Sequence, residues 1–468
     1  MKNMNERKFG IGDKLGYALG DFGNNATLQV MQIVLLIFAT KVLGISGAIM
    51  GILFMVARFA DAFTDVTMGR IVDTYSDKNG ERFRPWIRRM AVPVVLFSIL
   101  MYNYWIVNWP MWGKVMYIFV TYLIYGSVCY TGINIPYGAM ANLITDDPAQ
   151  RTVLSTFRST GSALGGMIIG ILVPLVIYVK DSSGNDIASG PRIFLLAVIM
   201  GVFALLSYAA CYFGCKERVH VPVKTAEKAG NVWHQMGTMC KDKAILTILL
   251  ISICTLAATG TFLSLNSFLF LDYFGNTGLQ AIASLGSVFG MLIVAPFAPA
   301  LSKKFGKKEL SIAGFIIYIL SYAGRLFLRQ AAPFLVLNLL GYIGLGLHVM
   351  VNWAMISDCI DNYYVTTGSH ADGTIYAIYS FVQKLSGAIT GSIGAWSLAA
   401  IHYDNLAVVQ IQPVRDAIYL LNICLPAGFI LIALVLMILY PLNREKVREN
   451  ASKLKEFSAN SVDLQSTK

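Results

Sequence analysis

Residues 52–72 read ILFMVARFADAFTDVTMGRIV, an apolar stretch interrupted by two carboxylates, Asp61 and Asp65. An ionised side chain in the hydrocarbon of a bilayer costs a few kcal/mol, so such residues usually face a protein interior or a water-filled cavity. Positions four apart share one face of a helix, and Arg58 lies on the same face. The stretch therefore predicts a membrane helix whose paired carboxylates hold a cation or a proton. The alternative is an internal salt bridge with Arg58 that only joins helices.

The composition of the whole chain is that of a membrane protein. The chain has 468 residues, of which 56% are hydrophobic and 13% charged, and its mean hydropathy is +0.61. Soluble proteins carry about 25% charged residues. A helix of about 20 apolar residues crosses a bilayer. Twelve such stretches occur, at residues 15–41, 46–74, 86–108, 112–143, 151–179, 191–215, 244–272, 279–302, 309–328, 332–360, 372–402 and 416–441. We predict an all-α polytopic membrane protein with twelve transmembrane helices.

The net charge of +11 reflects topology. If both termini are cytoplasmic, most of the 37 lysines and arginines fall in cytoplasmic loops and tails. The outer side then holds Lys41, Lys114, Lys180, Arg192, Arg325, Arg329 and Arg415. This asymmetry follows the positive-inside rule. The distribution of the excess lysines and arginines therefore predicts cytoplasmic termini and does not indicate a nucleic-acid partner.

A polar stretch at residues 216–243 divides the twelve spans into six and six. The loops after spans 2 and 8 match, because both are short, basic and contain glycine; the second reads LSKKFGKKEL, residues 301–310. Such halves are typical of transporters that rock two helix bundles around a midplane site. We predict an N-terminal bundle at 1–215, a linker at 216–243, a C-terminal bundle at 244–442 and a polar tail at 443–468.

Polar side chains interrupt the first span at GDFGNNA, residues 20–26. Asp21 shares a helix face with Asn24 and with Asn25. Three polar side chains within a membrane span need partners. A water-filled cavity that binds hydroxyl groups would provide them, and so would a purely structural hydrogen-bond cluster between helices.

The fourth span contains YTGINIPYG, residues 130–138, in which Tyr130, Thr131 and Asn134 lie within about one turn. Pro136 removes a backbone donor, and we expect it to loosen the helix. Carbonyl oxygens and the Thr131 hydroxyl would suit Na⁺. The Asn134 amide both donates and accepts hydrogen bonds, which suits a sugar hydroxyl.

Two isolated basic residues, Arg158 and Lys384, lie in the fifth and eleventh spans. Neither is stable in a bilayer without a counter-charge. We expect that charge from Asp61 and Asp65, with Asp21 as a further candidate, so that one buried cluster joins four helices. The cluster would couple a cation to a substrate, or it would be purely structural.

The tenth span carries Asn352 and Trp353, expected to form a wall against a sugar ring or to pack in the core. Charged residues at predicted cytoplasmic helix ends form a candidate gate. These residues are Asp73, Arg82, Arg84, Arg88, Arg151, Asp358 and Asp361. The alternative is that they are ordinary surface charges.

Several of these stretches together resemble one family. They are KLGYALGDFGNN (14–25), RFADAFTD (58–65), MGRIVDTYSDKNGERFRPWI (68–87), YTGINIPYGAM (130–140), FRSTGSALGG (157–166), WAMISDCIDNYYVTTG (353–368) and YAIYSFVQKLSGAITG (376–391). The chain resembles the glycoside–pentoside–hexuronide:cation symporters of the major facilitator superfamily, to which melibiose permease belongs. Asn25, Asn134 and Gly138 replace two aspartates and a tryptophan of that permease. The sequences of these stretches are closer to those of the glucuronide and xyloside branch of the family.

The resemblance implies roles for particular residues. Asp61, Asp65 and Thr131 match the cation site, where Na⁺ is a possible ligand. The expected substrate-contacting residues are Asp21, Asn24, Asn25, Tyr130, Asn134, Arg158, Trp353, Tyr379, Ser380 and Lys384.

We therefore expect a secondary active transporter of the cell membrane, not an enzyme, that imports a glycoside, pentoside or hexuronide with Na⁺ or H⁺. No cofactor is expected beyond this coupling ion, and the partners are the sugar, the cation and the lipid bilayer. A monomer suffices for this mechanism. The alternatives are a facilitator or exporter of another solute and a non-transporting sugar sensor on the same fold.

Overall fold

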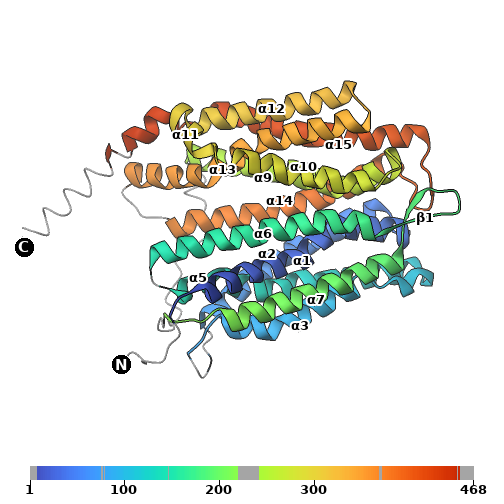
Figure 1. The fold of residues 1–468 in the computed structure, drawn as a ribbon, viewed down its shortest axis with the longest axis horizontal. Coiled ribbons are helices and arrows are strands. Elements are labelled where there is room, and N and C mark those ends of the chain that lie inside the picture. The colour runs from blue at the N-terminus through green and yellow to red at the C-terminus, as the bar shows by residue number, and fades with distance from the viewer. Residues whose placement is uncertain are drawn as a thin grey trace, which may run out of the picture. The chain divides into compact units, whose positions relative to one another are not determined.

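The computed structural model describes residues 8–74, 77, 80–145, 147–219, 242–367, 372–450 and 452–453 (Figure 1). Most of these residues are helical, and the helices coincide with the twelve predicted spans. Within this part of the chain, ten helical spans are long and apolar enough to cross a membrane, and α10 is a shorter apolar helix. The predicted all-α architecture is confirmed.

The first half of the chain supplies the helices and strands that carry the candidate site. They are α1 (Ile11–Ile37), η1 (Phe38–Val42), α2 (Gly47–Thr74), α3 (Arg84–Leu100), η2 (Tyr104–Asn108), α4 (Met111–Leu123), η3 (Ile124–Tyr130), α5 (Thr131–Ile144), α6 (Pro148–Val176), β1 (Tyr178–Lys180), β2 (Asp186–Ala188) and α7 (Gly190–Gly214).

The second half is also helical in its described residues. Its elements are α9 (Lys243–Phe268), η4 (Leu269–Tyr273), α10 (Gly278–Val294), α11 (Ala298–Phe305), α12 (Lys307–Phe327), α13 (Ala331–Thr367), α14 (Asp372–Ala400) and α15 (Gln412–Leu439). In the predicted tail, residues 444–450 are helical, and the residues after 453 lie outside the described part.

The described residues form two compact units. The first contains those within Met1–Glu227, Leu263–Ser284 and Gly391–Tyr419, and the second contains those within Lys228–Phe262, Leu285–Thr390 and Leu420–Lys468. The predicted linker lies mostly outside the described residues, and the predicted domain boundaries stay a prediction.

In the first unit, α1 packs against both α6 and α7. Gly161 of α6 allows this contact, because a Cβ atom there would lie only 2.2 Å from the backbone oxygen of Ala18. Small residues let membrane helices approach closely. The close approach at Gly161 therefore sets the distance between the polar residues of α1 and α6.

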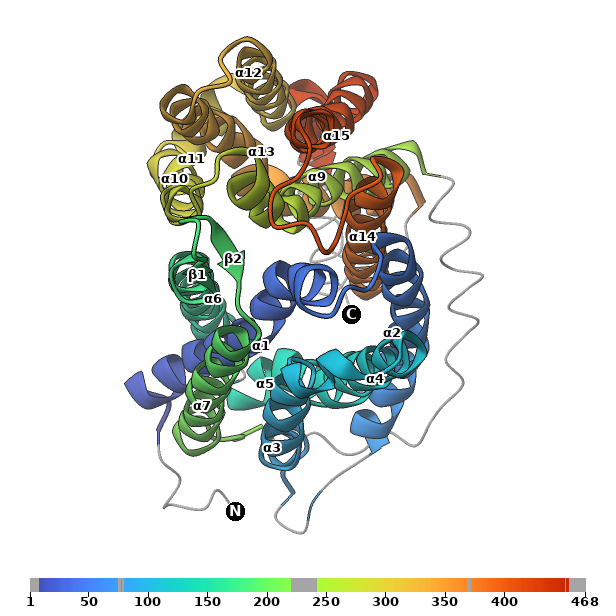
Figure 2. The ribbon, with the colours of Figure 1, turned by 90° about the vertical axis from the view of Figure 1, so that its right-hand side faces the viewer.

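Several predicted spans depart locally from a single α-helix. The first and seventh end in the π-helical segments η1 and η4, and the third ends in the 3₁₀-helix η2. The fourth span comprises α4, the π-helical segment η3 and α5, and the eighth comprises α10 and α11 with three intervening residues. An antiparallel hairpin, β1–β2, joins α6 to α7, with Tyr178 opposite Ala188 (Figure 2). The hairpin is a small addition to the predicted all-α fold.

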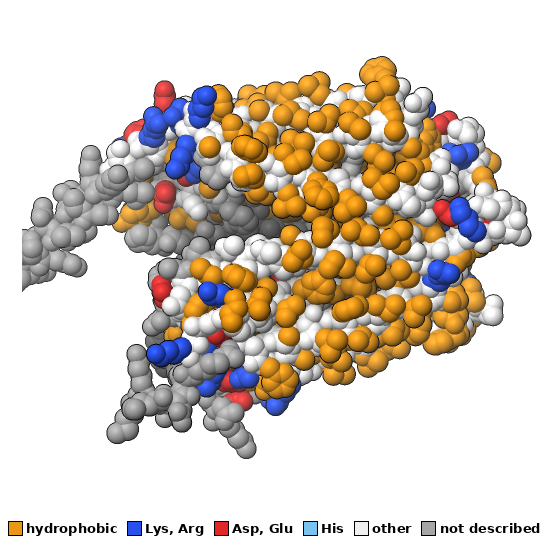
Figure 3. Space-filling model, viewed as in Figure 1, with side chains coloured by type: hydrophobic (Ala, Val, Ile, Leu, Met, Phe, Trp, Pro, Cys, Tyr) orange, Lys and Arg blue, Asp and Glu red, His pale blue; other side chains and the backbone are white. Residues whose placement is uncertain are grey.

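The surface displayed in Figure 3 matches a lipid environment. Apolar side chains cover the middle of the helices, while Lys, Arg, Asp and Glu gather toward helix ends. Large apolar side chains such as Phe63, Phe213 and Phe327 are exposed. Because backbone groups in lipid must be satisfied internally, continuous helices are the structure that such sequences require.

Candidate functional site

Asp61 and Asp65 project from α2 toward the junction of η3 and α5. The Thr131 hydroxyl donates to Oδ1 of Asp65 at 2.9 Å, and the Ser127 hydroxyl donates to Oδ1 of Asp61. On its own helix, Arg58 donates from Nη1 to Oδ2 of Asp61 at 3.3 Å. These five side chains are called the α2 carboxylate site below. The predicted salt bridge with Arg58 is present, and it engages Asp61.

The wide backbone of η3 places this site. A π-helical segment has i→i+5 hydrogen bonding and occurs frequently at functional positions. A Cβ atom on Gly126 would lie 3.3 Å from Oδ1 of Asp61, so a glycine gives that carboxylate room. The Gly126 carbonyl also accepts from the Thr131 hydroxyl at 3.2 Å.

Sequence reasoning places the loosened turn at Pro136, whereas the structure places the wide turn at residues 124–130. The helix α5 continues through Pro136. A proline removes one backbone hydrogen bond, which a membrane helix tolerates when its neighbours satisfy the freed carbonyl.

A second polar group lies between α1 and α6. Arg158 donates from Nε to Oδ1 of Asp21 at 3.0 Å. Asn25 donates from Nδ2 to Oδ2 of Asp21 at 3.2 Å and to the Ser162 hydroxyl at 3.0 Å. The Asp21 side chain is 9% exposed, but that of Arg158 is 40% exposed. The guanidinium thus keeps an accessible face while it neutralises a buried carboxylate.

Two further predicted residues extend this group, which is called the α1–α6 polar cluster. Asn24 donates from Nδ2 toward Oδ1 of Asn134 at 3.5 Å, and its own Oδ1 accepts from the Tyr208 hydroxyl at 3.0 Å. The Arg158 guanidinium lies 5.3 Å from the ring centre of Tyr137. The cluster therefore offers amide, hydroxyl, aromatic and cationic groups, which are the groups that bind a polar ring compound.

Tyr130 connects the two groups. The Tyr130 hydroxyl interacts electrostatically with Asp21 and Arg158 of the one group and with Arg58 and Asp65 of the other. The predicted single charge cluster is therefore two groups in the described residues, and the half-buried Tyr130 interacts with both. Asp21 is the counter-charge of Arg158, and Arg58 is that of Asp61.

Some predicted site residues lie outside the described side chains. These are Asp73, Trp353, Tyr379, Ser380 and Lys384. Their expected roles stay predictions.

The candidate gate residues have partners within their own units. Arg84 donates from Nε to the Tyr212 carbonyl at 2.7 Å, and Arg151 donates from Nε to the Thr145 carbonyl at 2.9 Å. Asp358 forms an ion pair with Lys307, the first residue of α12, at 2.7 Å. Asp361 also has a partner. The gate itself stays a prediction.

Sequence reasoning missed several residues that contact the predicted ones. Ser127 lies four residues before Thr131 and therefore on the same face, a spacing that could have revealed it. Ser162 likewise lies four residues after Arg158. By contrast, Tyr208 of α7 approaches Asn24 only through tertiary packing.

Within the described residues, no group of three or more His, Cys, Asp or Glu side chains is arranged to hold a metal ion. A cation at the α2 carboxylate site would therefore rely on two carboxylates together with hydroxyl and carbonyl oxygens. Hard monovalent cations favour such oxygen ligands.

Comparison with known proteins identifies the family. Residues 16–444 match the model of the MFS/sugar transport protein family. The chain belongs to this family. The match covers the residues of both polar groups, and it confirms the resemblance inferred from the motifs.

Two relatives illustrate the range of this sugar transport family. The glucuronide carrier protein homolog of Escherichia coli K12 is 29% identical over 445 residues, which is 93% of each chain. A Salmonella typhimurium protein provisionally named as a 2,3-dihydroxypropane-1-sulfonate exporter is 31% identical and covers 84% of each chain. Both names describe transporters, so this chain is a membrane transporter and not an enzyme.

A solved structure shows the same fold. The nucleoside transporter NupG superposes with a TM-score of 0.62 at 14% identity, covering 92% of this chain and 98% of NupG. The chain therefore has the all-helical major facilitator fold of this transporter family.

Proposed function

We propose that this transporter is a symporter of the cytoplasmic membrane that imports a glycoside, pentoside or hexuronide together with Na⁺ or H⁺. The observation that carries the proposal is the α2 carboxylate site, where Asp65 meets Thr131 and Asp61 meets Ser127 within membrane-spanning helices. Carboxylates in such helices usually mark an ion or substrate path.

The carboxylates of this site support the binding of a coupling ion. A cation or proton bound at Asp61 or Asp65 offsets their negative charge, which a low-dielectric interior disfavours.

The α1–α6 polar cluster is the proposed sugar site. Its amides from Asn24, Asn25 and Asn134 suit sugar hydroxyls, which both donate and accept. The accessible face of Arg158 suits a carboxylate, because a guanidinium binds planar anions bidentately. A hexuronide is therefore the favoured substrate within the class, in keeping with the name of the E. coli glucuronide carrier homolog.

Tyr130 provides the proposed link between ion and sugar. Its hydroxyl feels the charge of both groups, so cation binding at Asp65 changes the potential that a sugar meets at Arg158. Such a coupling free energy acts equally in both directions. A single chain holds both groups, so a monomer suffices.

The test is uptake of labelled glucuronide and xyloside into proteoliposomes under an imposed Na⁺ or pH gradient. Accumulation should follow one gradient and should be lost in Asp61→Asn and Asp65→Asn, while sugar counterflow persists. Asp181→Asn, in the exposed turn between β1 and β2, is the matched control. Full accumulation in both α2 variants would contradict the coupling role.

A facilitator or exporter is the second candidate, because a relative at 31% identity is provisionally named an exporter. This candidate predicts counterflow without gradient-driven accumulation, or net efflux from inverted vesicles. Saturable sugar binding with neither flux would instead indicate a sensor.

A further inference from the structure

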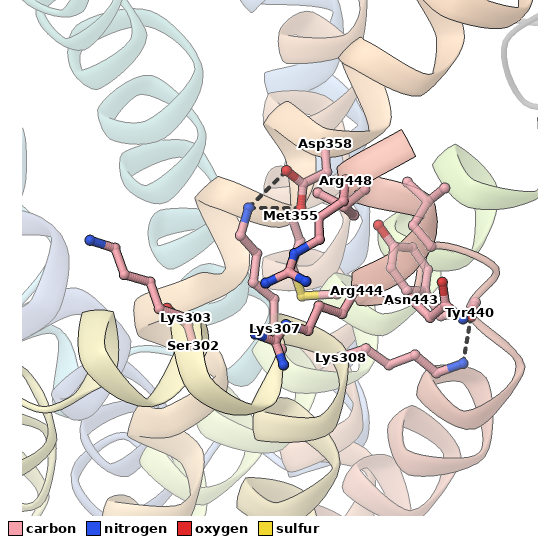
Figure 4. A pocket seen from close by; sticks show the side chains of 13 residues that line it. Ser302, Lys303, Lys307, Lys308, Met355, Asp358, Tyr440, Asn443, Arg444 and Arg448 are labelled. Carbon is pink, nitrogen blue, oxygen red and sulfur yellow. Dashed lines mark hydrogen bonds and ion pairs between the residues drawn. The ribbon is translucent and has the colours of Figure 1, made fainter. Parts of the chain in front are cut away.

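A basic pocket lies at the predicted cytoplasmic end of the second unit. It has a volume of about 430 Å³ and is lined by the end of α11, the start of α12, Met355 and Asp358 within α13, the residues just after α15 and the helix at 444–450 (Figure 4). Ligand cavities typically have volumes of about 300–1,000 Å³. The transport sites proposed above lie in the first unit, so this pocket is separate from them.

The pocket is strongly cationic. Five basic side chains line it, against the single carboxylate of Asp358, and they are Lys303, Lys307, Lys308, Arg444 and Arg448. Two of the five are already engaged. Lys307 binds both oxygens of Asp358 at 2.7 and 2.8 Å, and Lys308 donates to the carbonyls of Ile438 and Tyr440 at 2.9 and 2.6 Å.

The other three cations remain for a ligand. Figure 4 shows Arg444 and Arg448 extending from one helix toward Lys307. Arg444 donates one bond, to the Lys304 carbonyl at 2.9 Å. Among the described residues, the ion pairs of this region join Lys307 to Asp358 and Lys446 and Lys453 to Glu449, and none involves Lys303, Arg444 or Arg448. Converging like charges repel one another until an anion neutralises them.

We propose that this pocket binds a phosphate group, with the phosphodiester of an anionic phospholipid headgroup as its source. Guanidinium groups match phosphate oxygens bidentately, and paired arginines on one helix present two such forks. The pocket lies where α11 ends, α12 begins and the residues after α15 follow, on the predicted cytoplasmic side. Basic pockets between membrane helices on the cytoplasmic side are suited to multiply charged lipid headgroups.

Lipid binding to the purified full-length protein tests the proposal. Native mass spectrometry would titrate cardiolipin, phosphatidylglycerol, phosphatidylethanolamine and inorganic phosphate separately. The test variant is Arg444→Gln/Arg448→Gln. The matched control is Lys446→Gln/Lys453→Gln, which removes the same charge from the same short segment but from side chains that do not line the pocket.

We expect the anionic lipids to bind about tenfold more tightly than phosphatidylethanolamine, and this preference to disappear in the test variant only. Phosphate binding that is lost in the same variant, without a lipid preference, would keep the site and assign a free phosphate compound as its source. If binding of the anionic lipids and phosphate weakened equally in the test and control variants, or in neither, the proposal would be overturned. If the double variant does not fold, Lys303→Gln against Lys304→Gln gives the same comparison on α11.

Discussion

At the scale of single residues, the α2 carboxylate site shows how a hydroxyl on one helix orients a carboxylate on another. Thr131 reaches Asp65 across the interface between α2 and α5, and its oxygen is also a ligand that Na⁺ favours. A hydrogen bond to a charged group contributes about 1.5–3 kcal/mol. The contribution of Thr131 to cation affinity should therefore be measurable.

Thr131→Val should lower the affinity for the coupling cation about tenfold, which corresponds to about 1.4 kcal/mol. The reason is that valine lacks the hydroxyl but keeps the shape of the side chain. Cation-dependent stimulation of sugar binding measures this. Thr121→Val is the control, since the Thr121 hydroxyl bonds only within its own helix. Equal effects of the two changes would exclude a special role for Thr131.

The pair Asp21–Arg158 should behave as a coupled unit. Asp21→Asn or Arg158→Gln alone leaves the partner charge poorly compensated, at a cost of about 3–5 kcal/mol if burial were complete. Because Arg158 is 40% exposed, we expect a smaller loss, with Asp21→Asn tolerated better. Thermal unfolding of both single variants and the double variant forms a mutant cycle, and additive losses would contradict the coupling.

At the scale of helices and strands, the contact between α1 and α6 decides whether the polar cluster exists. Gly161 lies one turn from Arg158, and the backbone of Ala18 occupies the space that a side chain would need. The proposed sugar site therefore depends on a glycine that has no side chain to contribute to it.

Gly161→Ala should push α6 away from α1 and destabilise the protein by about 1–3 kcal/mol, as overpacking does. Sugar affinity should fall while the cation dependence of the remaining binding is retained. Gly428→Ala on α15 is the control, because a Cβ atom there meets nothing within 4 Å. Unchanged sugar affinity in Gly161→Ala would show that the cluster tolerates a wider helix spacing.

The hairpin is tied to the start of α10 by Asp186. Its carboxylate accepts from the backbone nitrogen and hydroxyl of Thr277 at 3.0 and 2.9 Å and pairs with Lys180. Burial alone would raise the pKa of Asp186, but the hydrogen bonds from Lys180 and Thr277 outweigh it and leave the pKa below its usual value. The stabilisation is thus present above the usual aspartate pKa of about 3.9 and is lost as the pH falls below it.

Between about pH 5 and pH 3, the wild-type protein should lose more thermal stability than Asp186→Asn. The difference should stay below about 1 kcal/mol, because Lys180 is largely exposed. Melting curves of the two purified proteins measure it. If Asp186→Asn lost more thermal stability on acidification than the wild type, the assigned direction of the Asp186 pKa shift would be contradicted.

At the scale of the molecule, a buried ion pair joins distant parts of the sequence in the first unit. Lys41 of η1 lies 3.2 Å from Asp272 of η4, with side chains 9% and 1% exposed. Asp272 also accepts from the Tyr403 hydroxyl at 2.7 Å, and Lys41 donates to the Ala407 carbonyl at 3.0 Å. The first span is thus held to segments more than two hundred residues away in the chain.

Removing one charge of this pair should destabilise the protein strongly, by about 3–5 kcal/mol for Asp272→Asn, because Lys41 would stay buried without its counter-charge. The double variant Lys41→Met/Asp272→Leu should recover most of this loss. Thermal unfolding with transport activity as a second readout checks both. A double variant as unstable as the single one would show that Tyr403 and the backbone contacts carry the stability instead.

The sequence by itself predicted the membrane class, the twelve spans and the α2 carboxylates. These follow from local rules, since a span is set by the length of an apolar run and a charge within it is visible directly. The same rules identified Asp21 and Arg158 as residues that needed partners. They could not identify which partner each would take, because that depends on which helices become neighbours.

Only the tertiary structure decided that Asp21 pairs with Arg158, that Arg58 pairs with Asp61, and that Tyr130 interacts electrostatically with residues of both groups. It also placed the wide turn at η3 rather than at Pro136 and revealed the Lys41–Asp272 pair. The Asp21–Arg158 and Lys41–Asp272 pairs join residues more than a hundred positions apart, and the backbone widening at η3 has no sequence signature. The Arg58–Asp61 pair lies within one helix, and the structure decided only that Arg58 takes Asp61. Helix spacing, set by residues such as Gly161, selects among the charge pairings that the sequence leaves open.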